Sequence, residues 1–230
     1  RPTIIDRIRG QSEEPYEAEM LLKRGERLPV ELAGKAMPYD GENHRMVIVR
    51  DITFRKQARE RMEFLALHDA LTQLPNRLYL DEYMERTLAL ARRQHNAVAL
   101  FFIDLDDFKQ INDTLGHQAG DEVLRETAQR LRAAVRESDL VARLGGDEFL
   151  VVLTNIESER DTERIANSVL AAMQPPVLLK RQLVTALPSI GIAMYPEHGD
   201  SMDALIRCAD TAMYQAKQAG GNRHVFWSAA

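Results

Sequence analysis

The feature that most constrains the fold is a run of apolar residues, AVALFFI, at positions 97–103. The run is much shorter than the roughly 20 residues that a membrane-spanning helix needs. A short apolar run of this kind is typical of a strand buried on both faces, whereas a strand with one wet face alternates apolar and polar side chains. We therefore expect residues 97–103 to form an interior strand of a sheet.

The segments around this run alternate between helical and strand-like patterns. Gly145 and Gly146 separate two short apolar segments, and paired glycines permit the positive φ of a tight turn, so we expect a hairpin there. The patterns together predict an α+β fold in which helices flank a mixed central sheet. The expected helices run from the Pro75–Asn76 break to 94 and over 120–135, 158–173 and 201–219, and the other expected strands are 140–144, 149–153, 178–187, 189–195 and 224–227.

The first 53 residues follow a different pattern. Residues 16–22, 28–37 and 45–52 alternate apolar and polar side chains between turns at 23–26 and 40–41. This alternation predicts an antiparallel sheet with one buried face. Residues 47–53 resemble the last strand and the terminal Asp-Ile-Thr of PAS sensor domains, which implies that residues 1–53 are the C-terminal part of a PAS-like sensor domain.

A helical linker is expected to follow. Thr53 is a suitable N-cap, and apolar residues then recur three or four apart up to position 68. The stripe would form either a short parallel coiled coil or a helix that packs on its own domain. We therefore divide the chain into a PAS-like part at 1–53, a connecting helix at 54–68 and a domain at 69–230. The residues of the stripe are Phe54, Ala58, Met62 and Leu65.

Composition excludes several classes of protein. The 230 residues carry a net charge of −5, with a pI near 5.7, and nucleic-acid binding depends on clustered Lys and Arg, so we expect no nucleic-acid partner. Cys208 is the only cysteine, which excludes internal disulfides and cysteine-based zinc sites and fits a reducing compartment. We expect a cytoplasmic location, and the sequence leaves open a membrane anchor upstream of Arg1.

Acidic residues stand where strands and turns are expected to end. Asp104 follows the apolar run, and Asp147 with Glu148 follows the paired glycines. Such carboxylates can converge on Mg²⁺, which prefers a few protein oxygens completed by substrate phosphates. From spacing alone, a Gly-Gly hairpin with solvated acids is the simpler interpretation.

Longer sequence motifs favour the metal-site interpretation of these acids over the simple hairpin. Five segments, in order over about 160 residues, resemble the GGDEF family of nucleotidyl cyclases. They are residues 69–77 (DALTQLPNR), 102–113 (FIDLDDFKQIND) with Gly116-His117 and Gly120-Asp121, 143–149 (RLGGDEF), 189–193 (SIGIA) and 209–217 (ADTAMYQAK). The resemblance implies a diguanylate cyclase that condenses two GTP into cyclic di-GMP and pyrophosphate across a homodimer, because each domain holds one GTP.

The resemblance also implies roles for individual residues. Asp104, the Leu105 carbonyl and Asp147 would hold Mg²⁺ or Mn²⁺, which polarises the α-phosphate. Glu148 would bind a second cation or help to deprotonate the attacking 3′-hydroxyl, and Lys109 would stabilise charge in the transition state. The nucleotide would be bound by Phe108, Asn112, His117, Asp121 and Lys217, with Asn112 and Asp121 reading guanine.

Each of these roles has a structural alternative. Asn112 could belong to a turn, His117 could be a structural histidine, and Lys217 could be a solvated cation at a helix end. At the level of the whole chain, the rival is a regulatory GTP-binding module that controls a downstream EAL phosphodiesterase. This sequence contains no EAL domain. A degenerate scaffold is a third alternative, but its signature acids would be lost, and here they are intact.

Two further positions give specific expectations. Arg136 and Asp139 resemble the RxxD site at which cyclic di-GMP inhibits the family, and Arg164 is the nearest candidate for an additional arginine. Gly221 stands where the family pattern has an arginine that clamps phosphate. We expect this departure to weaken GTP binding, and Gly221→Arg to raise the rate or lower the KM. Arg223 could take over, although we expect it to point elsewhere after the turn.

Overall fold

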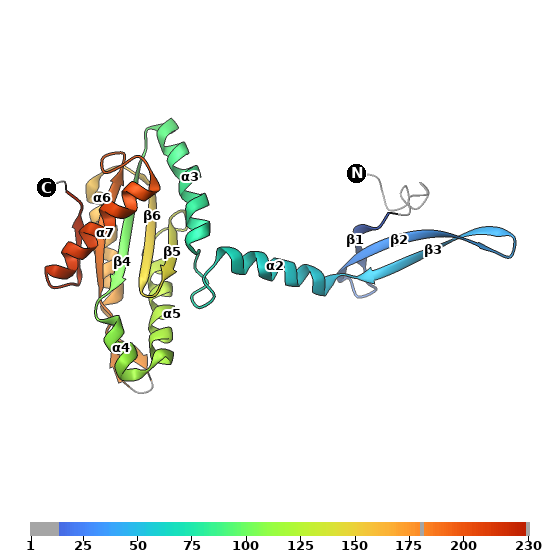
Figure 1. The fold of residues 1–230 in the computed structure, drawn as a ribbon, viewed down its shortest axis with the longest axis horizontal. Helices are drawn as coiled ribbons and strands as arrows, with labels where there is room; N and C mark the ends of the chain where they lie inside the picture. The colour runs from blue at the N-terminus through green and yellow to red at the C-terminus, as the bar shows by residue number, and fades with distance from the viewer. Residues whose placement is uncertain (1–13, 180–181, 229–230) are drawn as a thin grey trace. The chain divides into compact units, whose positions relative to one another are not determined.

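The computed structural model describes residues 14–179 and 182–228. By its internal contacts the chain separates into two compact units, Arg1–Phe64 and Leu65–Ala230. Both contain a sheet, and Figure 1 shows the elements of each. Among the described residues, no helix is long and apolar enough to span a bilayer.

The N-terminal unit contains the expected antiparallel sheet. Strands β1 (Tyr16–Leu21), β2 (Arg27–Tyr39) and β3 (Glu42–Asp51) pair in the order β1-β2-β3. The β2–β3 register runs from Val30 opposite Asp51 to Tyr39 opposite Glu42. Within its described residues, however, the unit buries only two apolar side chains, Val30 and Ile52. The consecutive β3 residues 47–49 are 41–50% exposed, so neither face of this strand is covered there, in contrast to the one buried face that the alternation predicts.

Helix α2 (Thr53–Leu67) continues from this sheet. Its first turn is capped by Asp51, whose Oδ1 accepts a hydrogen bond of 2.8 Å from the Thr53 backbone N–H. The helix has no buried residue, and Phe54 and Met62 are 84% and 71% exposed. The stripe is therefore not packed on the chain's own domain in this structure. A coiled coil between two copies stays a prediction.

The C-terminal unit is built on a five-stranded mixed sheet, which confirms the predicted α+β fold. Its strand order is β10-β9-β4-β6-β5, in which only β10 and β9 are parallel. A separate hairpin is formed by β7 (Val177–Leu179) and β8 (Gln182–Val184). The sheet strands are β4 (Ala97–Leu105), β5 (Leu140–Gly145), β6 (Glu148–Ile156), β9 (Pro188–Tyr195) and β10 (Arg223–Phe226).

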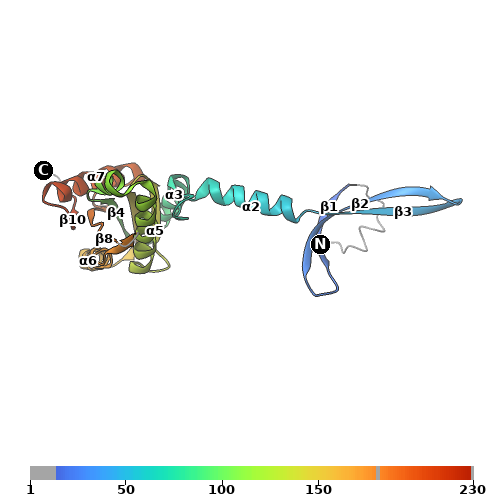
Figure 2. The ribbon, with the colours of Figure 1, turned by 90° about the horizontal axis from the view of Figure 1, so that it is seen from below.

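Helices cover the two faces of this sheet (Figures 1 and 2). They are α3 (Arg77–Gln94), α4 (Phe108–Leu115), α5 (His117–Ala134), α6 (Glu159–Met173) and α7 (Met202–Gln218). Successive β4 side chains point to opposite faces. Phe101 and Ile103 therefore join α5 and α6 in one apolar core, whereas Leu100 and Phe102 join α3 and α7 in a second. The run at 97–103 is an interior strand, as its composition predicts.

Four local features differ from the sequence-based expectations. Helix α4 occupies a segment that the sequence analysis left without an element, and α5 begins at His117 rather than at 120. The strand expected at 178–187 is instead the short β7–β8 hairpin. The hairpin turn between β5 and β6 consists of Gly146 and Asp147, because Gly145 still pairs with Glu148. Asp147 therefore lies at the tip of the turn.

Candidate active site

The site begins where β4 ends. Asp104 pairs in register with Glu148 on one side and with Ser189 on the other. It is only 8% exposed, and the next residue, Leu105, is 1% exposed. Because β4 is the central strand, this carboxylate is held rigidly at the edge of the core and next to the hairpin turn that carries Asp147.

The hairpin turn is fixed by a partly buried arginine. Arg143 on β5 donates from Nη2 and Nε to the Gly146 carbonyl at 2.6 and 3.1 Å. Its Nη1 donates to Asp69 Oδ1 at 2.8 Å. Asp69 in turn accepts from the Thr72 backbone N–H and hydroxyl. The motif at 69–77 therefore braces the turn that presents Asp147 and Glu148.

The acidic side chains act on one another's pKa. Burial raises the pKa of Asp104, and the charges of Asp147 and Asp106 raise it further, whereas the hydrogen bond and charge of Lys217 oppose this shift. Burial also raises the pKa of Glu148, with further contributions from Asp104, Asp147 and Asp210. Burial and nearby like charges disfavour the ionised forms of Asp104 and Glu148. The cluster therefore favours a bound cation.

The donors fit a hard cation that substrate helps to hold. Asp104 Oδ1 is buried without a well-directed hydrogen bond, although Lys217 Nζ lies 2.5 Å away as an ion pair. Among the described residues, no three His, Cys, Asp or Glu side chains form a ready-made metal cage. A cation here would need the backbone oxygen of Leu105 and phosphate oxygens to complete its shell, which is how Mg²⁺ is commonly bound.

Next to the acids lies the start of α4, where the first backbone N–H groups of the helix have no partner within the helix. Asp107 has left-handed dihedrals (φ 57°, ψ 20°), caps α4 without a side-chain hydrogen bond, and is followed directly by the helix. A left-handed residue that leads into a helix points successive N–H groups at one spot, and the helix dipole adds positive potential. Asp107 lines a pocket of about 300 Å³ with Asp106, Lys217, Gly220 and Gly221. This pocket suits an anion.

The residues expected to read guanine lie where α4 meets α5. The Asn112 amide lies so close to Gly120 that a Cβ at that position would overlap its Oδ1 and lie 3.0 Å from its Cγ. Asp121 is the next residue, and both Asn112 and Asp121 are partly exposed. Phe108 is 7% exposed and packs in the core, and its ring lies beside Gly120, where its Cζ would be 3.2 Å from an added Cβ.

The remaining expected site residues are placed as follows. Lys109 lies exposed in the first turn of α4, and His117 is the exposed first residue of α5. Lys217 lies in the last turn of α7 and pairs with Asp104. It is therefore more than a solvated cation at a helix end.

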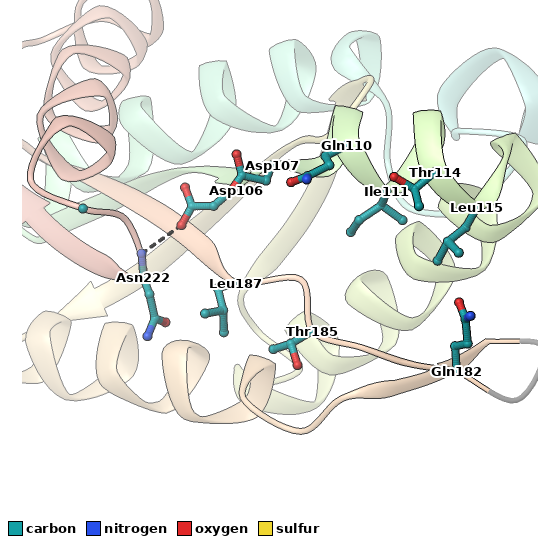
Figure 3. A pocket seen from close by; sticks show the side chains of 11 residues that line it. Asp106, Asp107, Gln110, Ile111, Thr114, Leu115, Gln182, Thr185, Leu187 and Asn222 are labelled. Atoms are coloured by element: carbon teal, nitrogen blue, oxygen red, sulfur yellow. Dashed lines mark hydrogen bonds between the residues drawn. The ribbon is translucent and has the colours of Figure 1, made fainter.

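A second pocket, of about 490 Å³, lies on the other face of α4 (Figure 3). Ile111 and Leu115 of α4 line it together with Gln182, Thr185 and Leu187 from the segment after β7. It shares Asp106 and Asp107 with the anion pocket as a common wall. Asn112 and Asp121 do not line it, so this pocket is separate from the expected guanine contacts.

The expected inhibitory residues share a third pocket. Arg136 and Asp139 line a cavity of about 550 Å³. They are linked by hydrogen bonds between the Arg136 N–H and Asp139 Oδ2 and between the Asp139 N–H and the Arg136 carbonyl. The additional arginine that lines this cavity is Arg132, one turn earlier on α5, rather than Arg164, which pairs with Asp161 on α6.

Sequence reasoning missed several supporting residues. Asp106 accepts from the Ser189 hydroxyl at 2.7 Å and from the Asn222 backbone N–H at 2.9 Å, so it fixes the turn after α7. The acidic run at 104–107 was a signal for Asp106. Asp69 and Arg143 both lay in recognised motifs, but nothing in the sequence indicated that they pair.

Comparisons with known proteins agree with this fold and site. Residues 66–223 match the family described as diguanylate cyclase, GGDEF domain. The chain is 51% identical over 162 residues to diguanylate cyclase TpbB of Pseudomonas aeruginosa, covering 70% of this chain and 37% of TpbB. The chain thus spans little more than a third of that relative. The fold and the site define an α+β domain with an acidic cluster beside an anion pocket. The family match assigns this domain: the chain belongs to the GGDEF domain family.

Solved structures give the same result. The isolated GGDEF domain of TpbB from Pseudomonas aeruginosa superposes with a TM-score of 0.68 at 48% identity, covering 70% of this chain and 94% of that one. The coiled coil and GGDEF domain of DgcB from Caulobacter crescentus, solved with c-di-GMP, gives a TM-score of 0.68 at 26% identity. That comparison covers 76% of this chain and 93% of DgcB's.

Proposed function

We propose that this protein is a diguanylate cyclase that converts two GTP into cyclic di-GMP and two pyrophosphates. The observation that carries the proposal is the meeting of an acidic cluster with the anion pocket at the start of α4. A cation site beside a triphosphate site is the arrangement that phosphoryl-transfer chemistry requires. The relatives named diguanylate cyclase support this reaction over the regulatory-module alternative.

The nucleotide would bind with its phosphates at the start of α4. The N–H groups after Asp107 would donate hydrogen bonds to the terminal phosphates, and Lys109 and Lys217 would add positive charge. Asn112 and Asp121 would bind the guanine edge, because a carboxylate accepts from its N1–H and exocyclic amine, a pair of donors that adenine lacks. Asp104, the Leu105 carbonyl and Asp147 would hold Mg²⁺ or Mn²⁺, which neutralises the triphosphate and polarises the α-phosphate.

The reaction balances when two chains face each other. The 3′-hydroxyl of one GTP attacks the α-phosphorus of the other, a new O–P bond forms, and the bond to pyrophosphate breaks. Glu148 is suited to accept the hydroxyl proton, because burial and neighbouring charges raise its pKa and make it a stronger base. The second attack closes the ring. Catalysis then depends mainly on how two sites are positioned.

The N-terminal part would control this positioning. We propose that residues 1–53 belong to a PAS-like sensor and that the exposed stripe of α2 pairs with a second copy. Arg136 and Asp139 would bind cyclic di-GMP as an inhibitory site, with the guanidinium pairing to phosphate and the carboxylate to guanine. The DgcB structures solved with c-di-GMP support product binding by this family.

The test is to identify the product. The purified chain is incubated with GTP and Mg²⁺, and the products are separated and weighed by mass spectrometry. We expect cyclic di-GMP from the wild type, and none above about 1% of that rate from Asp147→Asn or Asp104→Asn, with unchanged circular dichroism. Full activity in either variant would overturn the site, and no cyclic di-GMP from the wild type would overturn the proposed function.

Base selectivity gives a second readout. Asp121→Ala is expected to lose the preference for GTP over ATP in binding, because the guanine donors lose their acceptor. Binding of both nucleotides unchanged from the wild type would exclude Asp121 as a guanine contact.

A further inference from the structure

The turn between α7 and β10 is held in place by the side chain of Asp106, which follows the end of β4. Gly220 and Gly221 both have positive φ, at 105° and 70°. Asp106 Oδ2 accepts a 2.9 Å hydrogen bond from the Asn222 backbone N–H, and Asp106 Oδ1 accepts from Ser189. Figure 3 shows the Asp106 carboxylate directed at the Asn222 backbone. One carboxylate thus connects the ends of β4 and α7.

These hydrogen bonds hold the Asp106 carboxylate where a side chain at position 221 would have to lie. A Cβ on Gly221 would overlap Asp106 Oδ2 and lie 2.9 Å from its Cγ. The positive φ would add strain for any residue other than glycine. The pocket therefore receives no cation from this position, and Gly221→Arg could supply one only by displacing Asp106.

Arg223 is positioned to take this role. It is the first residue of β10, and its Nε donates to the Gly221 carbonyl at 3.2 Å. This bond turns the guanidinium back over the turn, so that Nη2 lies 3.8 Å from where a Cβ on Gly220 would be. Arg223 itself does not line the anion pocket, but Gly220, beside its guanidinium, lines both that pocket and the pocket of about 490 Å³.

The charge of Arg223 is available. The side chain is exposed, and within the described residues it has no carboxylate partner. Lys217, the lysine that lines the pocket, is already paired with Asp104. A triphosphate brings several negative charges into a pocket that also contains Asp106 and Asp107, so a further cation at its rim is needed.

We infer that Arg223 binds the terminal phosphates of the nucleotide from across the Gly220–Gly221 turn, with Asp106 holding that turn in place. The inference rests on the proposed nucleotide site. It explains how the chain keeps a second phosphate cation although position 221 has no side chain. Asp106 is a positioning residue, and Arg223 is the residue that contacts phosphate.

The test compares nucleotides with and without terminal phosphates. 3′-Deoxy-GTP lacks the attacking hydroxyl, so its binding is measured without turnover, and GMP lacks the β- and γ-phosphates. Calorimetry with Mg²⁺ is run on the wild type, Arg223→Gln, Arg223→Lys and the control Arg160→Gln, which removes an exposed arginine of α6. We expect Arg223→Gln to weaken 3′-deoxy-GTP about ten- to hundredfold. GMP affinity should change less than about twofold, Arg223→Lys should recover part of the loss, and the control should match the wild type.

The outcomes separate the two proposals. Equal weakening of 3′-deoxy-GTP and GMP would assign Arg223 a structural role and overturn the inference. Unchanged affinity for both would also overturn it, while tight wild-type binding would leave the nucleotide site standing. A wild type that binds neither nucleotide would overturn the proposed function together with this inference.

Discussion

The two sheets of this chain differ in what covers them. In the C-terminal unit, the β4 residues at 98–103 are at most 5% exposed, because helices pack on both faces. In the N-terminal unit, the β3 residues at 47–49 are 41–50% exposed. Both sheets have long hydrogen-bonded ladders, although the β4–β6 ladder has a register shift between Ala97 and Ala99. Backbone pairing is therefore common to both units, and apolar burial distinguishes them.

The difference indicates a division of roles. Burial of apolar area is the dominant favourable contribution to folding, so we expect the C-terminal unit to hold most of the chain's stability. This stability allows the C-terminal unit to tolerate acidic side chains whose ionised forms are disfavoured by burial and neighbouring charges. The N-terminal unit instead presents exposed apolar residues and surface ion pairs such as Arg55–Glu31. Exposed apolar surface of this kind is typical of contacts with other molecules.

The largest expected effect is on the central core. Phe101 is fully buried, and Phe101→Ala should reduce the free energy of unfolding of the C-terminal unit by about 4 kcal/mol. Val49→Ala in the N-terminal unit should cost less than about 1 kcal/mol because the side chain is half exposed. Trp227 is the only tryptophan, so its fluorescence in urea follows the C-terminal unit. Equal losses measured by circular dichroism would remove the distinction between the units.

The next effect concerns ion pairs. Arg143 and Asp69 have side chains that are 9% and 23% exposed, so Asp69→Asn should cost about 3 kcal/mol. Glu19→Gln breaks the ion pair with Arg27, in which the Glu19 and Arg27 side chains are 63% and 76% exposed, and should cost less than about 1 kcal/mol. Urea titration of the two variants measures both. Equal losses of unfolding free energy in the two variants would show that burial of an ion pair does not change its contribution to stability.

The cost of Asp69→Asn should depend on pH. Burial alone would raise the pKa of Asp69, but its hydrogen bonds with Thr72 and Arg143 outweigh burial and lower it. A lowered folded-state pKa gives stability that is present above the ordinary value of 3.8 and is lost as the pH falls through the folded value. The variant should therefore approach the wild type in acid. A difference that grows on acidification would contradict this assignment.

A matched pair of glycines gives a smaller effect. Gly25 in the N-terminal unit and Gly221 both have positive φ, but a Cβ on Gly25 would meet nothing within 4 Å. Gly25→Ala should cost about 1 kcal/mol from backbone strain alone. Gly221→Ala should cost about 2 kcal/mol, because it also pushes against Asp106. For the same reason Gly221→Arg should not raise the rate of cyclic di-GMP formation. A variant that is faster than the wild type and equally stable would show that Asp106 does not hold this turn in place.

The smallest effect should be a gain in stability. Glu148→Gln removes a charge that its neighbours disfavour, so the Tm at pH 7 should rise by roughly 2 °C. Because the folded-state pKa of Glu148 is raised, wild-type stability falls as the pH rises from the ordinary value of 4.5 through the folded value. The gain should therefore vanish in acid. A lower Tm for the variant at pH 7 would mean that the surroundings of Glu148 do not disfavour its ionised form.

Sequence patterns predicted the C-terminal unit well because its strands and helices are long or strongly apolar. The run at 97–103 and the helices α3, α6 and α7 are confirmed. Helix α4 was missed because its sequence FKQINDTL has only eight residues, and its pattern covers little more than two turns. Helix α4 nevertheless lines the pocket of about 490 Å³, and its N-cap residue Asp107 lines the anion pocket.

Contacts between distant residues were beyond the sequence. Asp106 and Asn222 are 116 residues apart, and Asp69 and Arg143 are 74 apart. Such pairings depend on how the strands end relative to one another, which no local pattern encodes. The motif resemblance supplied the candidate acids and lysines, whereas the position of the Asp106 carboxylate beside Gly221 and the direction of Arg223 required coordinates.

The central claim is that the chemistry needs two copies of the C-terminal unit brought together through the exposed N-terminal part. The most direct measurement is the initial rate of cyclic di-GMP formation against chain concentration, with the molecular mass followed by light scattering under the same conditions. We predict that activity per chain rises with concentration and levels off as the mass reaches that of a dimer. Constant activity per chain from a protein that stays monomeric by mass would contradict the account.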